Sequence, residues 1–422
     1  MTVAWNGTSV TTMRRHPPQM NLQSRVDSDR PAILGAPPCF DELVPIVRPV
    51  LPAFSEMEAD YREIFESRII TRGKHLEAFE EAVAASLQAK HVVAVSSGTC
   101  GLVLTYLGLG MTGEVIVPSF TFLATVGALV RAGARPVFVD VEPDTQNLDP
   151  EAVGRAITPR TTGIVAVHNF GNPAAIDSLQ AVARRHHLKL VFDAAHAFGS
   201  LYQGSPVGGQ PDAQVFSLSP TKLLIAGEGG IVATGDDQLA EYVRRGREYG
   251  MAPGYDSLFA GLNARMSELH AVLGLHSMQM LEAAVARRQE LAKLYQESLS
   301  DVPGIGFQTV RPGDRSSFKD FSITVDPEAF GLPRDDLAGA LRVENIDTRA
   351  YWNPPVHRQT AYQCFAPSED LLQNTVLLAQ RSLSLPLWSQ MDEQIVLRIA
   401  AAIRSVHLHA DELAEAIGAG DR

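Results

Sequence analysis

Lys222 lies in the stretch FSLSPTKLLIAGEGGIVAT, which covers residues 216–234. Apolar and glycine-rich residues follow it, a setting that withdraws an amine from water, lowers its pKa and makes it a better nucleophile and general base. A solvated surface lysine is the competing interpretation, and the apolar flanks weaken it. The position therefore predicts a lysine that carries out covalent or proton-transfer chemistry.

Asp193 and His196 follow an apolar run in the segment VFDAAHAFGS. A carboxylate at the end of a buried strand needs a cationic or hydrogen-bonding partner, because burial of an unpaired charge is costly. Asp193 as a helix N-cap and His196 as a hydrogen-bonded core histidine are the structural alternatives. On this segment alone, both the structural and the functional interpretations stay open.

A third segment, SSGTCGLVL over residues 96–104, passes from a strand-like run into a helix-like one. Gly98 allows the backbone to approach an anion, Thr99 adds a hydroxyl, and the free amides of a helix start favour negative charge. A simple tight turn has the same composition. Together with a buried acid and a lysine at neighbouring strand ends, however, a phosphate cradle is what a pyridoxal phosphate site requires, since the lysine forms a Schiff base and the acid keeps the pyridine nitrogen protonated.

The elements that would position these residues are short apolar runs alternating with helix-like stretches. Seven runs are candidate strands, namely HVVAVS, EVIVP, RPVFVD, GIVAVH, LKLVFD, AQVFSLS and GGIVAT, starting at residues 91, 114, 135, 163, 188, 213 and 229. Strands buried on both faces by crossover helices have this composition, so we predict an α/β fold with a mostly parallel seven-stranded sheet between helices. Ligands bind at the carboxyl ends of such strands.

Changes of pattern along the chain predict four segments. We expect a flexible N-terminal extension over residues 1–38, a large α/β domain over 39–262, a long linking helix over 263–300 and a small C-terminal α+β domain over 301–422. Helical spacing of apolar residues begins near Asn263 and ends near Leu299, and the strand-like KDFSITV and helix-like PRDDLAGALRV follow it.

Composition excludes several classes of protein. The formal net charge of −12 does not favour a nucleic-acid partner. The three cysteines are too far apart for a disulfide framework or a metal site, and a reducing, cytoplasmic location is expected. Apolar runs are too short for a membrane span, and the N-terminus does not resemble a signal peptide.

Several of these segments together resemble the DegT/DnrJ/EryC1/StrS family of sugar aminotransferases, which have the aspartate-aminotransferase-like fold type I. The resemblance covers roughly Arg48 to Ile403. Its markers are SSGTCGL, EVIVPSFTFLATVGALVRAGARPVFVDVEPDTQNLDP, VFDAAHAFGS, FSLSPTKLLIAGEGGIVAT, LNARMSELHAVLGL and SLSLPLW. Ordered motifs at this spacing are far more specific than any one of them alone.

The resemblance implies roles at matching positions. Lys222 would form the Schiff base with pyridoxal 5'-phosphate, and Asp193 would pair with the pyridinium. Gly98, Thr99 and Ser217 would hold the cofactor's phosphate.

Three further residues complete the implied site. Phe122 would stack on the cofactor ring, with a place in the plain core as the alternative, and His196 would lie near the ring's phenolic oxygen. Asn263 would reach the phosphate from the second subunit of a homodimer. The chain departs from the family pattern at a few neighbouring positions, which are Cys100, Gly101, Leu223 and Ala264. These departures bear on substrate choice more than on the cofactor.

The implied reaction moves an amino group from glutamate or glutamine to a keto sugar, nucleotide-linked, or to a related cyclitol ketone, for an amino sugar of a surface glycan or secondary metabolite. The segment RAYWNPPVHRQTAY, residues 349–362, is suited to a sugar or diphosphate pocket or to a surface loop. Some relatives carry histidine in place of the lysine and act as dehydratases, and Lys222 argues against that branch. A lyase or dehydratase on the same fold and a noncatalytic, cofactor-binding regulatory protein are the alternative functions.

Overall fold

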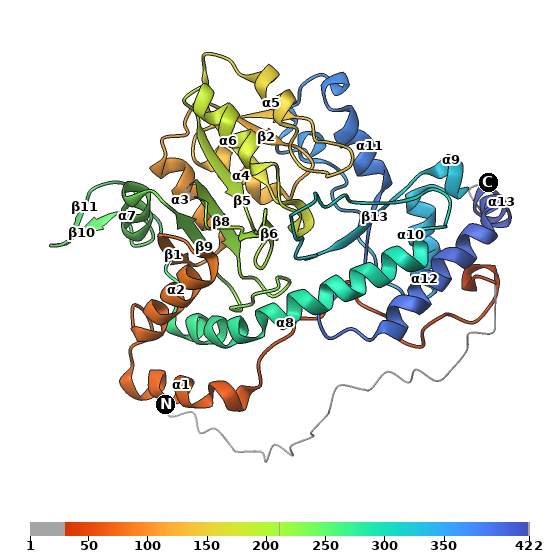
Figure 1. Cartoon of the computed structure of the whole chain (residues 1–422), viewed down its shortest axis with the longest axis horizontal. Helices are drawn as coiled ribbons and strands as arrows, with labels where there is room; N and C mark the ends of the chain where they lie inside the picture. Colours follow the sequence, from red (N-terminus) through yellow and green to blue (C-terminus); the bar gives the residue numbers. More distant parts are fainter. Residues whose placement is uncertain (1–29, 211, 421–422) are drawn as a thin grey trace, which may run out of the picture.

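A seven-stranded sheet forms the centre of the larger part of the molecule (Figure 1). The structure, a computed structural model, describes residues 30–210 and 212–420. The strand order is β1-β9-β8-β5-β4-β2-β3. The strands are β1 (His91–Val95), β2 (Glu114–Pro118), β3 (Arg135–Val139), β4 (Thr161–Val167), β5 (Lys189–Asp193), β8 (Ala213–Ser217) and β9 (Gly230–Thr234). Only β9 runs opposite to the other six strands of this sheet, so the predicted mostly parallel seven-stranded sheet is confirmed.

Helices cover both faces of this sheet. One face packs on α3 (Gly98–Gly108), α4 (Leu123–Arg131) and α7 (Asp237–Gly246), and the other on α2 (Lys74–Leu87), α5 (Pro150–Ala156), α6 (Ile176–Arg185) and α8 (Glu268–Leu299). Successive residues of a strand point to opposite faces, so Val93 joins the first cluster while Val92 joins the second. Burial on both sides is why these strands are continuous apolar runs instead of alternating ones.

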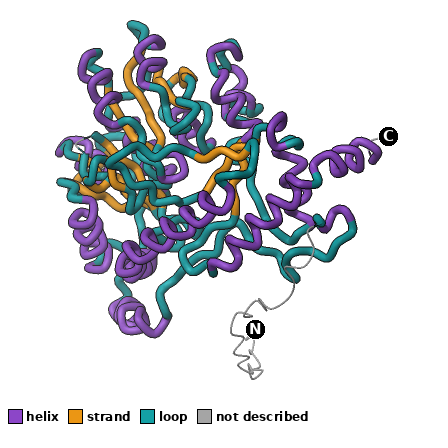
Figure 2. Tube along the Cα trace, turned by 45° about the vertical axis from the view of Figure 1, so that its right-hand side comes forward, coloured by secondary structure: helices purple, strands orange, loops and turns teal. Residues whose placement is uncertain are grey.

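The helix α8 links this sheet to a second, smaller core. It begins at Glu268, later than the periodicity predicts, because Ser267 caps the helix by accepting a hydrogen bond from the backbone of His270. Figure 1 shows α8 running from the large sheet towards α10 and α12, and Figure 2 shows the strands of the two sheets as separate groups with helices around them.

The smaller core surrounds a three-stranded antiparallel sheet of β12 (Ile305–Phe307), β13 (Phe321–Val325) and β14 (Ser382–Leu385). The helices of this region are α9 (Pro327–Phe330), α10 (Arg334–Val343), α11 (Gln373–Arg381), α12 (Glu393–Leu408) and α13 (Ala410–Gly420). Two short hairpins, β6 (Leu201–Tyr202) with β7 (Ser205–Pro206) and β10 (Met251–Ala252) with β11 (Asp256–Ser257), complete the strands. The smaller α+β unit is thus present, and the exact domain limits stay a prediction.

Most of the predicted N-terminal extension, residues 1–29, lies outside the described residues. Its last part packs against the smaller core. The carboxylate of Glu344 accepts hydrogen bonds from the backbone of Ala32, at 2.6 Å, and of Cys39, at 2.7 Å. The chain then reaches α1 (Phe54–Ser67), which packs on α8.

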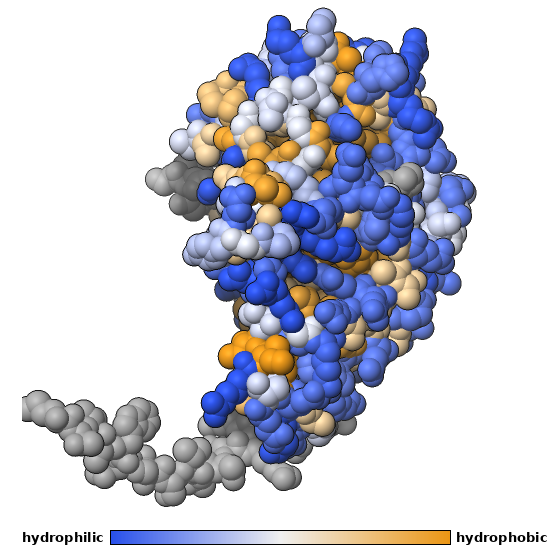
Figure 3. Space-filling view, turned by 90° about the vertical axis from the view of Figure 1, so that its left-hand side faces the viewer, coloured by the Kyte–Doolittle hydropathy of each residue, from blue (hydrophilic) through white to orange (hydrophobic). Residues whose placement is uncertain are grey.

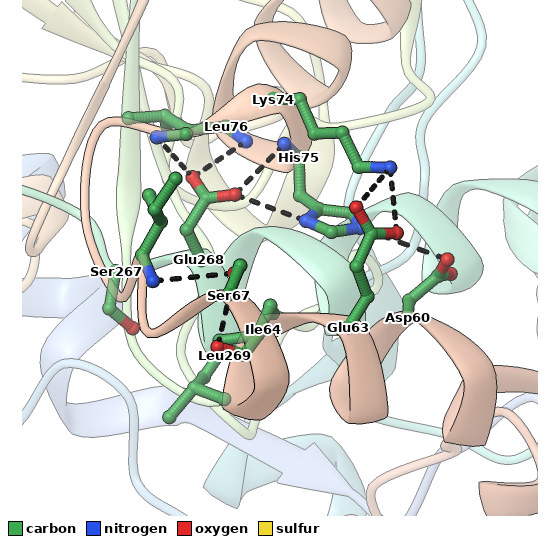
Figure 4. Close-up of polar contacts among 12 residues, drawn as sticks. Asp60, Glu63, Ile64, Ser67, Lys74, His75, Leu76, Ser267, Glu268 and Leu269 are labelled. Atoms are coloured by element: carbon green, nitrogen blue, oxygen red, sulfur yellow. Dashed lines mark hydrogen bonds and ion pairs between the residues drawn. The ribbon is translucent and has the colours of Figure 1, made fainter.

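Glu268, the first residue of α8, ties this helix to the start of α2 (Figure 4). Its side chain is 1 % exposed and accepts backbone hydrogen bonds from Gly73, His75 and Leu76 at 2.9, 2.9 and 3.1 Å. These amides are the ones that a helix start leaves without an intrahelical acceptor. The carboxylate therefore acts as an N-cap supplied by a residue distant in the sequence.

Among residues 30–210 and 212–420, no group of three or more His, Cys, Asp and Glu side chains is arranged to hold a metal ion. In the same residues, every helix is too short or too polar to cross a lipid bilayer.

Candidate active site

A cavity of about 300 Å³ lies where strands of the large sheet end. It is lined by residues that follow β1, β5 and β8 in the chain, as expected for the carboxyl edge of a parallel sheet. The structure brings together seven of the predicted site residues in this lining, which are Gly98, Thr99, Phe122, Asp193, His196, Ser217 and Lys222.

One end of the cavity is built to receive an anion. Gly98 and Thr99 are the first residues of α3, whose N-cap Ser97 accepts a hydrogen bond from the amide of Cys100 at 3.1 Å. A Cβ atom on Gly98 would lie 3.1 Å from the Cβ of Ser217, which is closer than nearly all Cβ contacts, so glycine favours this close approach of the helix start to the end of β8. The free amides of the helix start and the Ser217 hydroxyl suit a phosphate group.

Asp193, at the end of β5, is a buried acid with defined partners. Its side chain is 5 % exposed, and it accepts hydrogen bonds from Thr125 Oγ1 at 2.7 Å and from the Ala195 amide at 3.1 Å. Burial raises the pKa of this carboxyl, and both hydrogen bonds and the charge of Lys222 oppose that rise. No helix begins at Asp193, so the N-cap interpretation is wrong.

Lys222 lies across the same cavity and is largely withdrawn from water. Burial, followed by the positive charge of Lys319, lowers the pKa of Lys222 from 10.5 to about 7, although Asp320 and Asp193 act in the opposite direction. The prediction that desolvation lowers this pKa is confirmed. An amine with a pKa near neutrality is half deprotonated there, which suits both nucleophilic and proton-transfer chemistry.

His196 presents an orphaned polar atom. Its Nδ1 is buried and has no hydrogen-bonding partner among the described residues, so the interpretation of a hydrogen-bonded core histidine is not supported. Burial, together with the charges of Lys222 and Lys319, holds the pKa of His196 well below its usual range, so the ring is neutral. The ring stacks with that of Trp352 at a centroid distance of 5.9 Å.

Phe122 lies at the edge of the cavity and is 50 % exposed, which excludes a place in the plain core. Its ring makes a tilted contact with Trp352, with centroids 5.7 Å apart. Stacking of Phe122 on a cofactor ring stays a prediction.

The cavity lining also contains residues that were not among the predicted cofactor-binding residues. Lys319 comes from the segment before β13, and Tyr351 and Trp352 come from residues 349–362, so this segment is not a plain surface loop. Trp352 is fixed by a hydrogen bond from its Nε1 to Oδ1 of Asn169 at 2.9 Å. The aromatic pair shortly before two prolines is a sequence signal that indicates a pocket for Tyr351 and Trp352. For Lys319, the sequence shows only a charged residue beside an apolar run, which does not indicate a place in the cavity.

Asn263 is the one predicted site residue outside the cavity lining. It is exposed, and the next residue, Ala264, accepts a hydrogen bond from the amide of Ser96 at 2.8 Å. The backbone beside Asn263 is therefore held against the end of β1. A role for Asn263 in the site of a second subunit stays a prediction.

The residues of the cavity fit pyridoxal phosphate on four structural grounds. A glycine-dependent helix start can take the phosphate, a buried acid can take the pyridinium, an orphaned imidazole nitrogen can meet the phenolic oxygen, and an amine of lowered pKa can meet the aldehyde. All four line one cavity.

Comparison with known proteins also leads to an aminotransferase family. The family model described as the DegT/DnrJ/EryC1/StrS aminotransferase family matches residues 54–404. The chain is 35 % identical over 386 residues to dTDP-3-amino-3,4,6-trideoxy-alpha-D-glucose transaminase of Streptomyces venezuelae, which covers 91 % of this chain and 98 % of that protein. It is 34 % identical to the spore coat polysaccharide biosynthesis protein SpsC of Bacillus subtilis (strain 168), over 86 % of this chain and 97 % of that one.

Solved structures are similar over nearly the whole chain. A crystal structure of DesI in the presence of its TDP-sugar product has a TM-score of 0.85 and 35 % identity, and covers 93 % of this chain and 99 % of that chain. A crystal structure of S. venezuelae DesV has a TM-score of 0.80 and 36 % identity, over 84 % and 95 % of the two chains.

Proposed function

Because the chain belongs to the DegT/DnrJ/EryC1/StrS aminotransferase family and is a pyridoxal phosphate-dependent sugar aminotransferase, we propose that it moves an amino group from glutamate or glutamine to a keto sugar carried on a nucleotide. The observation that carries the proposal is the convergence of Lys222, Asp193 and His196 on one cavity. The TDP-sugar of DesI and the dTDP-sugar name of the Streptomyces relative support a nucleotide-linked acceptor.

The cofactor would be held by residues at both ends of the cavity. The amides of Gly98 and Thr99 and the hydroxyl of Ser217 would bind its phosphate. The carboxylate of Asp193, kept in place by Thr125, would pair with the ring nitrogen. When bound, the cofactor supplies an electrophilic carbonyl carbon and an electron-accepting ring.

Lys222 would do two tasks. Its neutral amine would attach to the cofactor, and after the donor displaces it, the same amine would take the proton from the donor's α-carbon and later return a proton. A pKa of about 7 for Lys222 supports this work near neutral pH. The neutral His196 would offer its Nδ1 as a hydrogen-bonding group beside the ring.

The acceptor would enter past the aromatic residues of the cavity. Tyr351 and Trp352 stack with centroids 4.7 Å apart, and the ring of Phe122 makes a tilted contact with that of Trp352. Flat apolar surfaces of this kind can receive the faces of a sugar ring and exclude water from the reacting atoms. Donor and acceptor would use the one cavity in turn, which gives ping-pong kinetics.

We also propose that the protein works as a homodimer. The exposed Asn263 would reach the phosphate site of the second copy. Figure 3 shows apolar side chains in patches on one otherwise hydrophilic face of the molecule. Around α1, Leu51, Phe54 and Phe65 are 52, 65 and 71 % exposed, and apolar groups of this size gathered on a surface support an interface between proteins.

The test is a pair of half-reactions followed by the visible absorbance of the bound cofactor. Glutamate or glutamine should convert the purified holoenzyme to its amine-carrying form, and a nucleotide-linked keto sugar should restore the starting spectrum. The Lys222→Ala variant should bind the cofactor without the spectrum of a lysine-attached form, while the exposed-lysine control Lys293→Ala should behave like the unaltered protein. Cofactor binding with no response to any donor would contradict the proposal and would favour a lyase or a regulatory protein.

A further inference from the structure

Lys319 contributes an ammonium group to the cavity wall, and the proposed reaction gives this group no role. It is 6 % exposed, and its Nζ lies 2.8 and 2.9 Å from the two carboxylate oxygens of the next residue, Asp320, which is also 6 % exposed. The ring of Tyr351 lies 5.9 Å from the same nitrogen. A buried ion pair adds little net stability, because desolvation of both charges offsets their attraction.

The segment that carries Lys319 is fixed between the two cores. The amide of Lys319 donates to the carbonyl oxygen of Phe170 at 3.0 Å, and the hydroxyl of Ser317 donates to the carbonyl oxygen of His196 at 2.7 Å. From α8, the buried guanidinium of Arg288 donates to the carbonyl oxygen of Lys319 at 2.8 Å. Both the amide and the carbonyl group of Lys319 are therefore held by hydrogen bonds, which fix the backbone from which its side chain extends to the cavity.

The cavity has few cationic side chains that could bind an anionic group of a substrate. Among the described residues that line the cavity, the lysine and arginine side chains are Lys222 and Lys319, and the amine of Lys222 is committed to the cofactor. An ammonium group has three N–H donors, and Asp320 engages two of them. Asp320 is the one hydrogen-bonding partner of this Nζ among the described residues, and Lys319 lines the cavity, so a donor is left with which an entering anion can pair.

We propose that Lys319 binds the α-carboxylate of the amino donor and that Asp320 and Arg288 position it. The inference rests on the proposed function, because it requires an amino-acid donor. Glutamate and glutamine both carry this carboxylate on the carbon that bears the reacting amine, so its binding cation must lie close to Lys222. Lys319 meets this requirement, since Lys319, Lys222 and His196 line the same cavity. The diphosphate of a nucleotide sugar is separated from its reacting carbon by the sugar ring.

The first test compares donors in the holoenzyme. Lys319→Met should raise the KM for glutamate by about 10- to 100-fold, as expected for the loss of a hydrogen bond to a charged group. It should leave the KM for 4-aminobutyrate, which lacks the α-carboxylate, within about twofold. The KM for the aminated sugar in the reverse half-reaction should also stay unchanged. Lys319→Arg should recover part of the loss, and Lys293→Met is the exposed-lysine control.

A binding measurement separates this inference from the proposed function. Glutarate, a dicarboxylate without an amine, should bind the holoenzyme in calorimetry, and its affinity should fall at least 10-fold in Lys319→Met. That result supports the anion site even in a protein that no donor converts. The double variant Lys319→Met, Asp320→Asn avoids leaving a buried carboxylate unpaired and should show the same loss.

Three outcomes would overturn the inference while leaving the aminotransferase proposal intact. The first is an equal loss for glutamate and 4-aminobutyrate, which would make Lys319 structural. The second is a loss confined to the sugar half-reaction, which would assign Lys319 to the acceptor's diphosphate. The third is unchanged glutamate KM and glutarate affinity in both Lys319 variants.

Discussion

Thr125, in α4, donates a hydrogen bond from its Oγ1 to Oδ2 of Asp193 at 2.7 Å. Its own oxygen lies 3.0 Å from Oγ1 of Thr121, so with its proton directed at Asp193, Thr125 accepts the proton of Thr121. The buried carboxylate thus sits at the end of a chain of hydroxyl groups that favours its charged form against the effect of burial.

Thr125→Val should weaken cofactor binding. Loss of this hydrogen bond raises the pKa of Asp193 further and reduces its pairing with a pyridinium, so the Kd for pyridoxal phosphate should rise about 10-fold or more. Absorbance titration of the cofactor-free protein measures it. Thr121→Val, one hydroxyl further from the carboxylate, should have a smaller effect. An equal or larger effect at Thr121 would contradict this assignment.

The amine of Lys222 should titrate near pH 7 in the cofactor-free protein. It is protonated and unreactive below that pH and neutral above it, whereas an exposed lysine reaches this state only near its usual pKa of about 10.4. Acylation rates at Lys222, followed by peptide mass spectrometry over pH 5–10, should show this midpoint. Because the charge of Lys319 lowers the pKa, Lys319→Met should move the midpoint upward. A midpoint unchanged by that variant would mean that Lys319 does not act on Lys222.

Gly98→Ala should damage the phosphate cradle. The new Cβ would lie 3.1 Å from the Ser217 Cβ and 3.3 Å from the Phe216 carbonyl oxygen, so the helix start or the strand end must shift. We expect the Kd for pyridoxal phosphate to rise about 10-fold. Gly154→Ala in α5, where a Cβ meets no atom within 4 Å, is the matched control and should leave the Kd unchanged.

Glu268→Gln should destabilise the protein without touching the cavity. The substitution removes the charge that three amides at the start of α2 share, which should lower the free energy of unfolding by about 2 kcal/mol. Urea unfolding followed by far-UV circular dichroism measures the change. Glu63→Gln breaks a nearby ion pair with Lys74 in which both side chains are about half exposed, and it should change stability by well under 1 kcal/mol. An equal loss of unfolding free energy in the two variants would show that the buried cap of Glu268 stabilises the protein no more than a surface ion pair does.

Two impaired variants should restore activity when mixed. If Asn263 serves the neighbouring subunit, a dimer of one Lys222→Ala chain and one Asn263→Ala chain contains one site with both residues intact. After joint refolding, about a quarter of the wild-type activity should return, because about half of the dimers are mixed and one of their two sites works. Full activity in a strictly monomeric protein, measured by light scattering, would exclude the shared site.

Local patterns were enough to predict the sheet and much of the cavity. All seven predicted strands of the large sheet are present, because burial on both faces leaves a local signature in each run of the sequence. Seven predicted site residues share one cavity, since each follows or lies beside a strand end and the ends of parallel strands meet at one edge.

Tertiary structure alone decided which distant residues complete the cavity. Lys319 reaches it from beyond α8, and Thr125 in α4 meets Asp193 at the end of β5. Glu268 caps α2, although all seven strands of the large sheet lie between them in the chain. Periodicity and motifs report what a residue's near neighbours in the chain require. A contact between segments that are far apart in the chain depends on how whole elements pack, and no local pattern contains that information. The sequence by itself therefore determined the sheet and the principal motifs, whereas packing decided their partners.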